Sequence, residues 1–224
     1  MDMDEKMKYV LEHTELIRPP QQHLATFGST RMNYYVVTGL GENVSVVRDG
    51  KVIAEKPRIV TPSYLIRLEG FSETARNYIG MMAREHPDEA GVFYRYKNEP
   101  RGMDVVSESM RQVISNLNAR IEEEQDPLSA IIKGVEEQWD VSLLIFIYHL
   151  TRKSVSSNVA EFSRRGFLNI DSSGVPGDAR SNIEELFDEV RRDISRAPEL
   201  VTELNRWGVF AEYQDRFFAL FRGK

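Results

Sequence analysis

The sequence contains no cysteine among its 224 residues. This absence excludes disulfide bonds, thiolate metal sites, iron–sulfur clusters and cysteine nucleophiles. Long hydrophobic runs are also missing, because the most apolar stretch, residues 141–148 (VSLLIFIY), is far shorter than the roughly 20 residues of a membrane-spanning helix. The opening segment MDMDEKMKYV is acidic and lacks the apolar centre of a signal peptide. We therefore expect a soluble, cytoplasmic protein without a membrane partner.

The short motifs that mark common catalytic sites are absent too. The chain has no phosphate loop of the form GxxxxGK(S/T), no GxGxxG after a predicted strand, no HExxH and no GxSxG. The four histidines form no i, i+4 pair on a predicted helix, and the polar cluster around His86 is typical of a solvated helix end. We expect neither a metal nor a cofactor. The missing motifs favour a protein that is not an enzyme, but they leave this question open, because many enzymes lack short signatures.

The charge balance limits the expected partners. The formal net charge is −6 and the isoelectric point is about 5.4. Proteins that bind nucleic acid without specificity are usually basic, because contacts to phosphates supply most of their affinity. The acidic balance therefore disfavours a nucleic-acid partner, without excluding a local basic patch. We expect a protein partner or a second copy of the chain instead.

The N-terminal half predicts a small antiparallel sheet. Residues 32–39 (MNYYVVTG) are aromatic and β-branched, which is typical of a strand. Two runs rich in valine and isoleucine flank Asp49-Gly50, a dipeptide that favours a tight hairpin turn. Residues 91–98 alternate like a fourth strand, and a helix over residues 73–86 would cover the sheet. We predict a three- to four-stranded meander with an Asp49-Gly50 hairpin and one covering helix.

The C-terminal half has a helical pattern almost to its end. Apolar residues recur at helical spacing over residues 110–121 and 183–194. Residues 141–150 are apolar nearly all round, which predicts the buried centre of a helical bundle. Residues 99–102 (EPRG) are a plausible linker. The predicted fold class is α+β, with an α+β region over residues 1–102 and a helical bundle region over residues 103–224, or one continuous domain.

One polar segment near the N-terminus concentrates side chains that could bind a ligand. Residues 13–31 read HTELIRPPQQHLATFGSTR, and the Pro19-Pro20 pair excludes a helix. The segment could be an ordered strap that joins the two halves and is tied down by side-chain hydrogen bonds. Alternatively, residues 18–31 could bind an anionic or phosphorylated small molecule, with or without catalysis. The side chains for this role are Arg18, His23, Ser29 and Arg31.

A second candidate lies in residues 141–174. A predicted helix, a break and a second helix, followed by RRGFLNIDSSG, are similar to a helix-turn-helix motif with a wing. Ser157 and Asn158 would then face bases. The basic residues would contact phosphates, and they are Arg152, Lys153, Arg164 and Arg165. The apolar first helix and the Pro176-Gly177 pair argue against this interpretation and favour two packed bundle helices with a polar connection.

Aromatic residues gather at the C-terminal end. They fall at helical spacing within WGVFAEYQDRFFALF and are Phe210, Phe217, Phe218 and Phe221. Core packing accounts for them most simply. A partner or dimer surface is the functional alternative, since aromatic side chains are enriched at interfaces.

Three functions therefore remain open. The sequence favours an interaction or regulatory protein without a recognisable catalytic motif. The first alternative is an enzyme that acts on an anionic or phosphorylated small molecule through residues 18–31. The second alternative is a nucleic-acid-binding protein that uses residues 141–174.

Overall fold

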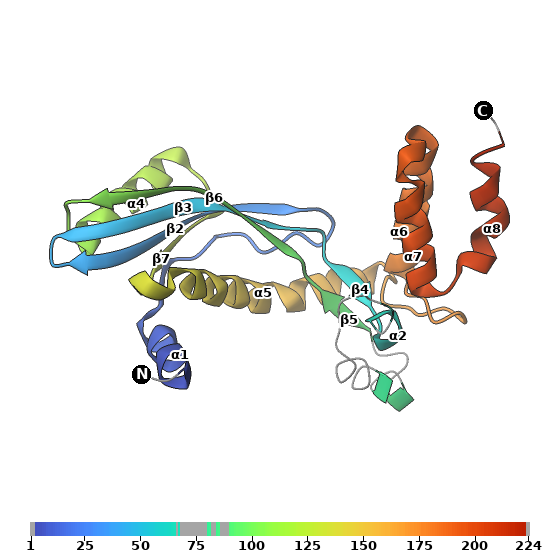
Figure 1. The fold of residues 1–224 in the computed structure, drawn as a ribbon, viewed down its shortest axis with the longest axis horizontal. Helices are drawn as coiled ribbons and strands as arrows, with labels where there is room; N and C mark the ends of the chain where they lie inside the picture. Colours follow the sequence, from blue (N-terminus) through green and yellow to red (C-terminus); the bar gives the residue numbers. More distant parts are fainter. Residues whose placement is uncertain (1–2, 66, 68–79, 82–83, 86–89, 223–224) are drawn as a thin grey trace. The chain divides into compact units, whose positions relative to one another are not determined.

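The computed structural model describes residues 3–65, 67, 80–81, 84–85 and 90–222 (Figure 1). The chain divides into two compact units, of which the first comprises Met1–Pro57 and Tyr94–Asn158 and the second Arg58–Phe93 and Val159–Lys224. Helix α5 (Trp139–Arg164) contributes residues to both units. The covering helix predicted over residues 73–86 lies largely outside the described residues.

The first unit is built on a five-stranded mixed sheet. Its strands, in spatial order, are β1 (Glu15–Arg18), β7 (Ser129–Lys133), β2 (Thr30–Gly41), β3 (Val44–Ala54) and β6 (Tyr96–Val106). Strands β2, β3 and β6 form the antiparallel part, whereas β2 and β7 run parallel. A parallel pair needs a crossover connection, and α4 (Met110–Glu124) belongs to it. The predicted α+β class is confirmed, and β1 and β7 extend the sheet beyond the predicted meander.

The predicted hairpin at Asp49-Gly50 is wrong. Strand β3 runs unbroken through both residues, and the turn lies at Glu42-Asn43, where β2 leads into β3. The two runs on either side of Asp49-Gly50 therefore belong to one long strand. The pairing of this strand with β2 extends along nearly its whole length, and this tertiary pairing overrides the local turn preference.

Gly50 has a different structural role. A Cβ atom built on it would lie 2.5 Å from the Tyr34 hydroxyl and 2.7 Å from the backbone oxygen of Glu99. The pairing with β6 is irregular at this point, because Asp49 lies opposite Gly102 and Gly50 lies opposite Pro100. A glycine inside a strand commonly marks a bulge or a close approach, and both occur here.

The predicted linker at residues 99–102 lies inside β6, where Glu99 and Gly102 pair with β3. The expected division between residues 102 and 103 therefore falls within a strand. Strand β6 is the edge of the sheet, and it carries Lys97, Glu99 and Arg101. Charged residues of this kind are typical of an exposed edge strand, because they discourage pairing with another chain.

Helices cover both faces of this sheet (Figure 1). Alternate residues of β2 face opposite ways, so Val37 packs with α4 and Val36 packs with α5. The buried residues of α4 repeat every four positions and are Val113, Leu117 and Ile121. The short helix η1 (Glu136–Gln138) precedes α5, and α1 (Met3–His13) precedes β1. No helix of the described residues has the length and apolar character needed to cross a membrane.

The expectation that residues 141–150 are buried all round is wrong. Leu143, Phe146 and Leu150 are buried, whereas Leu144 and Tyr148 are each 63% exposed. The reason is that this part of α5 packs on a sheet and not in the centre of a helical bundle. Only one stripe of the helix is therefore covered.

The second unit combines a two-stranded sheet with several helices. Strand β4 (Arg58–Val60) pairs with β5 (Gly91–Phe93). The helices are α2 (Pro62–Leu65), α6 (Gly177–Arg192), η2 (Ile194–Arg196), α7 (Ala197–Trp207) and α8 (Phe210–Ala219). The mostly helical character predicted for the C-terminal half is confirmed.

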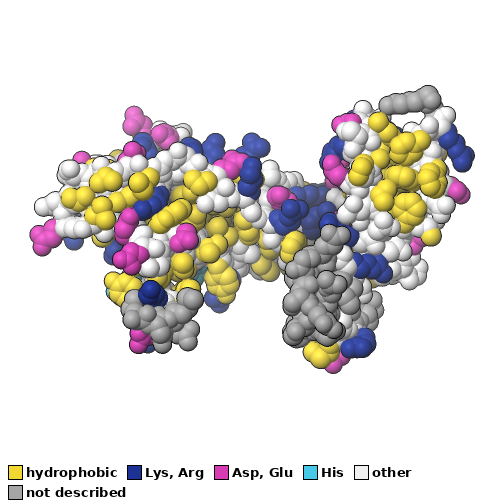
Figure 2. Space-filling model, in the orientation of Figure 1, with side chains coloured by type: hydrophobic (Ala, Val, Ile, Leu, Met, Phe, Trp, Pro, Cys, Tyr) yellow, Lys and Arg dark blue, Asp and Glu magenta, His cyan; other side chains and the backbone are white. Residues whose placement is uncertain are grey.

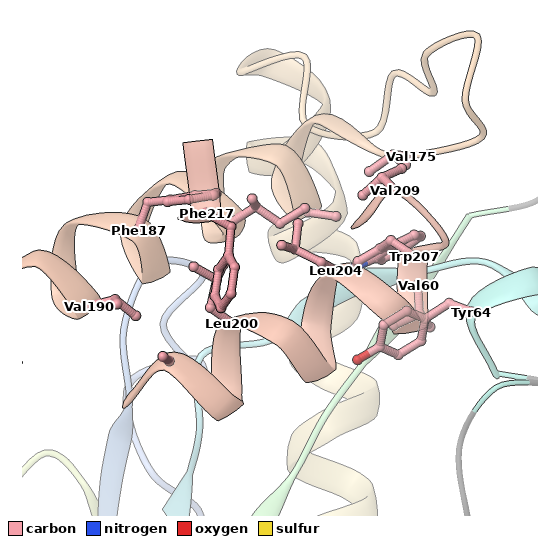
Figure 3. Packing of buried hydrophobic residues seen from close by; sticks show 13 residues of the cluster. Val60, Tyr64, Val175, Phe187, Val190, Leu200, Leu204, Trp207, Val209 and Phe217 are labelled. Atoms are coloured by element: carbon pink, nitrogen blue, oxygen red, sulfur yellow. The ribbon is translucent and has the colours of Figure 1, made fainter. Parts of the chain in front are cut away.

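Aromatic and aliphatic side chains form the core of the second unit (Figure 3). Phe187 from α6, Leu200 and Leu204 from α7 and Phe217 from α8 belong to this core. The ring centroids of Tyr64 and Trp207 lie 4.5 Å apart, so α2 packs on the end of α7. The helical spacing of apolar residues over 183–194 correctly predicted the buried face of α6.

Candidate functional site

Residues 19–29, between β1 and β2, have no regular secondary structure, and we call them the strap. The strap runs beside α5 (Figure 1) and is fixed to it by buried hydrogen bonds. The N–H of Leu24 donates to Ser154 Oγ at 3.0 Å, and the carbonyl of Leu24 accepts from Asn158 Nδ2 at 2.9 Å. The same amide nitrogen donates to Thr26 Oγ1 at 2.7 Å. The prediction of an ordered segment held by side-chain hydrogen bonds is confirmed, and these contacts lie within the first unit.

A cavity of about 420 Å³ opens beside the strap, and we call it the basic cavity. Its wall consists of residues from the strap, from β2 and from the loop before β7. They are Gln22, His23, Ala25, Ser29, Thr30, Arg31 and Leu128. Three of the four residues predicted to bind an anion, namely His23, Ser29 and Arg31, therefore line one cavity.

The basic cavity offers hydrogen-bond donors without a competing carboxylate in its wall. Within the described part of the chain, no hydrogen bond or ion pair engages the side chains of His23, Ser29 or Arg31. A guanidinium group carries five N–H donors and a hydroxyl carries one. These donors are consequently available to a ligand.

Two lysines on neighbouring strands add positive charge near Arg31. The pairing register places Lys51 of β3 and Lys97 of β6 on the same face of the sheet as Arg31. All three cations act on Glu99, whose pKa is lowered mainly by a hydrogen bond from Lys97 at 2.6 Å and further by the charges of Arg31 and Lys51. Three positive charges thus act on one carboxylate, and only Lys97 is in contact with it, although the whole chain has a net charge of −6.

The sequence did not predict that Lys51 and Lys97 belong to this group. A turn at Asp49-Gly50 would have placed Lys51 at the start of a separate strand. The signal for this charged group is that Lys97 and Glu99 are two positions apart and therefore lie on the same face of a strand. Using that signal requires the true register between β2, β3 and β6.

The loop that supplies Leu128 to the basic cavity is held firmly by Asp126. The carboxylate of Asp126 accepts the N–H of Leu128 at 2.9 Å, the hydroxyl of Ser129 at 2.7 Å and Nδ2 of Asn33 at 2.7 Å. Burial acts to raise the pKa of Asp126, but these hydrogen bonds outweigh it and lower the pKa. This wall of the cavity is therefore set in place before any ligand arrives.

Arg18 does not belong to the basic cavity. Its Nη1 atom donates to Asn118 Oδ1 and to Glu122 Oε1, each at 3.2 Å. Arg18 thereby links β1 to α4, and its charge is already balanced by Glu122. The prediction that Arg18 acts with His23, Ser29 and Arg31 on one anion finds no support in this arrangement.

The segment predicted to resemble a helix-turn-helix is a single helix up to residue 164. Helix α5 passes through Ser157 and Asn158 without a break, and the side chains of Ser154 and Asn158 bind the strap. Asn158 is 1% exposed, so it cannot face a base. Ser157 and the four basic residues are exposed, and the latter are Arg152, Lys153, Arg164 and Arg165. Phosphate binding by them stays a prediction.

The C-terminal aromatic residues have two different environments. Phe217 is buried and Phe210 packs against the core, whereas Phe218 and Phe221 are 45% and 46% exposed. Figure 2 shows hydrophobic side chains gathered on the second unit in the region of α6 and α8. Core packing is thus confirmed for Phe217, while a partner surface remains a prediction for Phe218 and Phe221.

Buried carboxylates in the second unit have structural partners. Asp178 accepts the N–H of Ile59 at 3.0 Å, and Glu203 accepts from Arg58 Nη2 at 2.6 Å and from Trp207 Nε1 at 3.1 Å. These contacts join β4 to α6 and α7. Over the described residues, no three histidine, aspartate or glutamate side chains lie where they could hold one metal ion.

Comparisons with protein-family models, with curated protein sequences and with solved structures found no match to this chain. The proposal about function therefore depends on the geometry of the basic cavity.

Proposed function

We propose that this protein binds a small anionic molecule, such as a phosphate ester, in the basic cavity. The observation that carries the proposal is the convergence of His23, Ser29 and Arg31 on one cavity that has no carboxylate in its wall. Arg31 forms no ion pair within the described residues, and a guanidinium group without such a partner favours an anionic ligand from outside.

The chemistry of the wall suits an oxyanion. A guanidinium group matches the geometry of a phosphate or carboxylate with two parallel hydrogen bonds, and Arg31 can supply them. Ser29 and His23 can add single hydrogen bonds, while Lys51 and Lys97 attract the anion from a greater distance. The volume of about 420 Å³ is within the range of roughly 300–1,000 Å³ that is usual for small-molecule sites. Ligand binding of this kind requires no catalytic motif.

The proposal is tested by thermal unfolding in inorganic phosphate and in chloride at the same ionic strength. A ligand that binds only the folded state raises the melting temperature as its concentration increases. We expect phosphate to raise the melting temperature of the natural protein more than chloride does. We expect this difference to vanish in the double variant His23→Gln, Arg31→Gln.

The matched control is Arg111→Gln, which removes one positive charge from an exposed position on α4. This variant should retain the response to phosphate. Equal responses to phosphate in the double variant and in the natural protein would contradict the proposal.

A second function, protein–protein interaction, is supported by a different observation. The rings of Phe218 and Phe221, near the end of α8, pack beside Phe217 but remain about half exposed, and aromatic rings of this kind are common anchors at interfaces. We propose a protein partner or a second copy of the chain as their occupant. Sedimentation of the natural protein and of Phe218→Ser, Phe221→Ser distinguishes these cases, since self-association would be lost in the variant. Two results together would contradict this second function. They are a monomeric natural protein in sedimentation and the absence of any protein partner whose binding is lost in the Phe218→Ser, Phe221→Ser variant.

A further inference from the structure

A second cavity of the first unit, with a volume of about 320 Å³, lies between α5 and the chain around Pro19-Pro20. We call it the apolar cavity. Its floor is hydrophobic and is formed by Leu16, Pro19, Pro20, Phe146 and Leu150. Phe146 and Leu150 belong to the buried core beneath the sheet, and Leu16 packs against that core. The cavity therefore has a wall that is fixed by the fold.

The proline pair stiffens the backbone that lines the apolar cavity. Each proline ring fixes the backbone φ angle of its residue, which limits the conformations open to this part of the wall. The strap beyond this pair is held to α5 through Leu24. Both ends of the wall are thus constrained, as is usual for pre-formed ligand sites.

Two nitrogen-bearing side chains complete the wall of the apolar cavity. His149 and Lys153 are four residues apart on α5 and so lie on the same side of the helix. Both are exposed, and neither forms an ion pair within the described residues. No aspartate or glutamate lines the cavity. The wall of this otherwise apolar cavity therefore carries a positive charge that no other side chain of the wall neutralises.

We propose that the apolar cavity binds an amphipathic carboxylate, a small molecule with a hydrocarbon body and one anionic head. The body would contact Phe146, Leu150 and the proline rings, where its apolar surface is removed from water. The carboxylate would accept hydrogen bonds from Lys153 and His149. This combination of an apolar wall with a few polar groups is typical of sites that orient small ligands.

Calorimetric titration of the full chain with four probes tests the proposal. The probes are octanoate, 1-octanol, octylammonium and acetate, all below the concentration at which they form aggregates. Octanoate has both features of the proposed ligand, octanol lacks the charge, octylammonium reverses it, and acetate lacks the hydrocarbon body. We expect octanoate to bind most tightly, octanol more weakly, and octylammonium and acetate not measurably. Equal binding of octylammonium and octanoate, or no binding of octanoate, would overturn the proposal.

Charge-reversal variants identify the residue that holds the head group. Lys153→Glu should weaken octanoate binding by roughly tenfold or more, as expected for the loss of a charge-assisted hydrogen bond. Arg152→Glu makes the same charge change at an exposed neighbour outside the cavity wall, so it should leave the affinity unchanged. Equal affinities in the two variants would overturn the role of Lys153 and with it the proposed ligand class.

Two further arms separate this inference from its alternatives. The variant His23→Gln, Arg31→Gln should keep its affinity for octanoate, because the basic cavity is a different site. Loss of octanoate binding in this variant would contradict the claim that the two cavities bind ligands independently. Sedimentation with phosphatidylglycerol vesicles tests whether the occupant is a membrane. Binding to vesicles without binding to free octanoate would overturn the proposal in favour of a lipid surface.

Discussion

The side-chain amide of Asn158 donates a hydrogen bond to the backbone carbonyl of Leu24 at 2.9 Å, although the two residues are 134 positions apart in the chain. This contact fixes the strap to α5. The side chain of Asn158 is fully used, because its Oδ1 atom accepts from the hydroxyl of Tyr94 at 2.7 Å. The strap is the segment that carries His23 and Ser29 to the basic cavity. Its shape therefore depends on a helix that follows it by more than a hundred residues.

Asn158→Ala should destabilise the protein by about 2–4 kcal/mol. The substitution leaves the Leu24 carbonyl and the Tyr94 hydroxyl without their partner, and each unsatisfied buried polar group costs about 1–3 kcal/mol. Denaturant unfolding measures this loss. Ser157→Ala is the control, since Ser157 is exposed on the same helix, and it should change the free energy of unfolding by less than about 0.5 kcal/mol. Similar losses in both variants would show that Asn158 does not hold the strap.

Alkaline pH should weaken the first unit through Tyr94. Burial, with a smaller contribution from Tyr96, raises the pKa of Tyr94 to about 12, whereas an unfolded tyrosine titrates near pH 10. The folded state therefore retains a proton that the unfolded state loses. The resulting stability is complete below about pH 10 and disappears as the pH rises towards 12.

The measurement for Tyr94 is the free energy of unfolding between pH 9 and pH 12. At pH 9 the free energy of unfolding of Tyr94→Phe should be lower than that of the natural protein, because the hydrogen bond to Asn158 is lost. Between pH 9 and pH 12, however, it should fall less steeply. Tyr148→Phe at an exposed site is the control and should keep the steep decline. If the free energies of unfolding of the natural protein and Tyr94→Phe fell in parallel with pH, the alkaline loss of stability would not come from Tyr94.

Gly50→Ala should cost about 1–3 kcal/mol, the usual penalty for an atom added to a filled space. Its new methyl group would meet the Tyr34 hydroxyl and the backbone of β6 at less than 3 Å. Gly41→Ala is the matched control, since a Cβ atom there has no neighbour within 4 Å. Thermal unfolding of the two variants compares them directly. A Gly50→Ala variant as stable as Gly41→Ala would mean that the two strands do not approach this closely.

Leu143→Ala and Leu144→Ala test which side of α5 is buried. Leu143 is 3% exposed and its truncation should cost about 2–5 kcal/mol, whereas Leu144 is 63% exposed and its truncation should cost less than about 0.5 kcal/mol. The residues are adjacent and chemically identical, so helix propensity cancels in the comparison. Equal costs would indicate that α5 is covered on both sides.

The periodic parts of the fold could be predicted from the sequence, because local spacing determines them. The faces of α4 and α6 followed from an apolar period of 3.6. The strand character of residues 32–39 followed from their aromatic and β-branched side chains. The Asp49-Gly50 turn was predicted wrongly, since strand pairing over a long register outweighs the preference of a dipeptide. The parallel β2–β7 pair could not be predicted, because it joins segments that are distant in the sequence.

The candidate site was predictable only in part. His23, Ser29 and Arg31 stood out because they are polar residues in a segment that Pro19-Pro20 keeps out of a helix. Arg18 was grouped with them in the prediction, whereas in the structure it contacts Glu122, which comes from a helix about a hundred residues later. The helix-turn-helix interpretation of residues 141–174 failed for a similar reason. Ser157 and Asn158 resembled a helix break, but α5 continues through both residues, and the side chain of Asn158 binds the distant strap.

The most direct test of the central claim is a backbone amide NMR titration of the full chain with inorganic phosphate, at an ionic strength kept constant with chloride. Binding in the basic cavity predicts that the largest shifts occur at the amides of residues 22–31 and of Leu128. The amides around Arg18 and Glu122 should change little, since that ion pair is already closed. Shifts of equal size over the whole surface, or shifts centred on Arg18, would contradict the account.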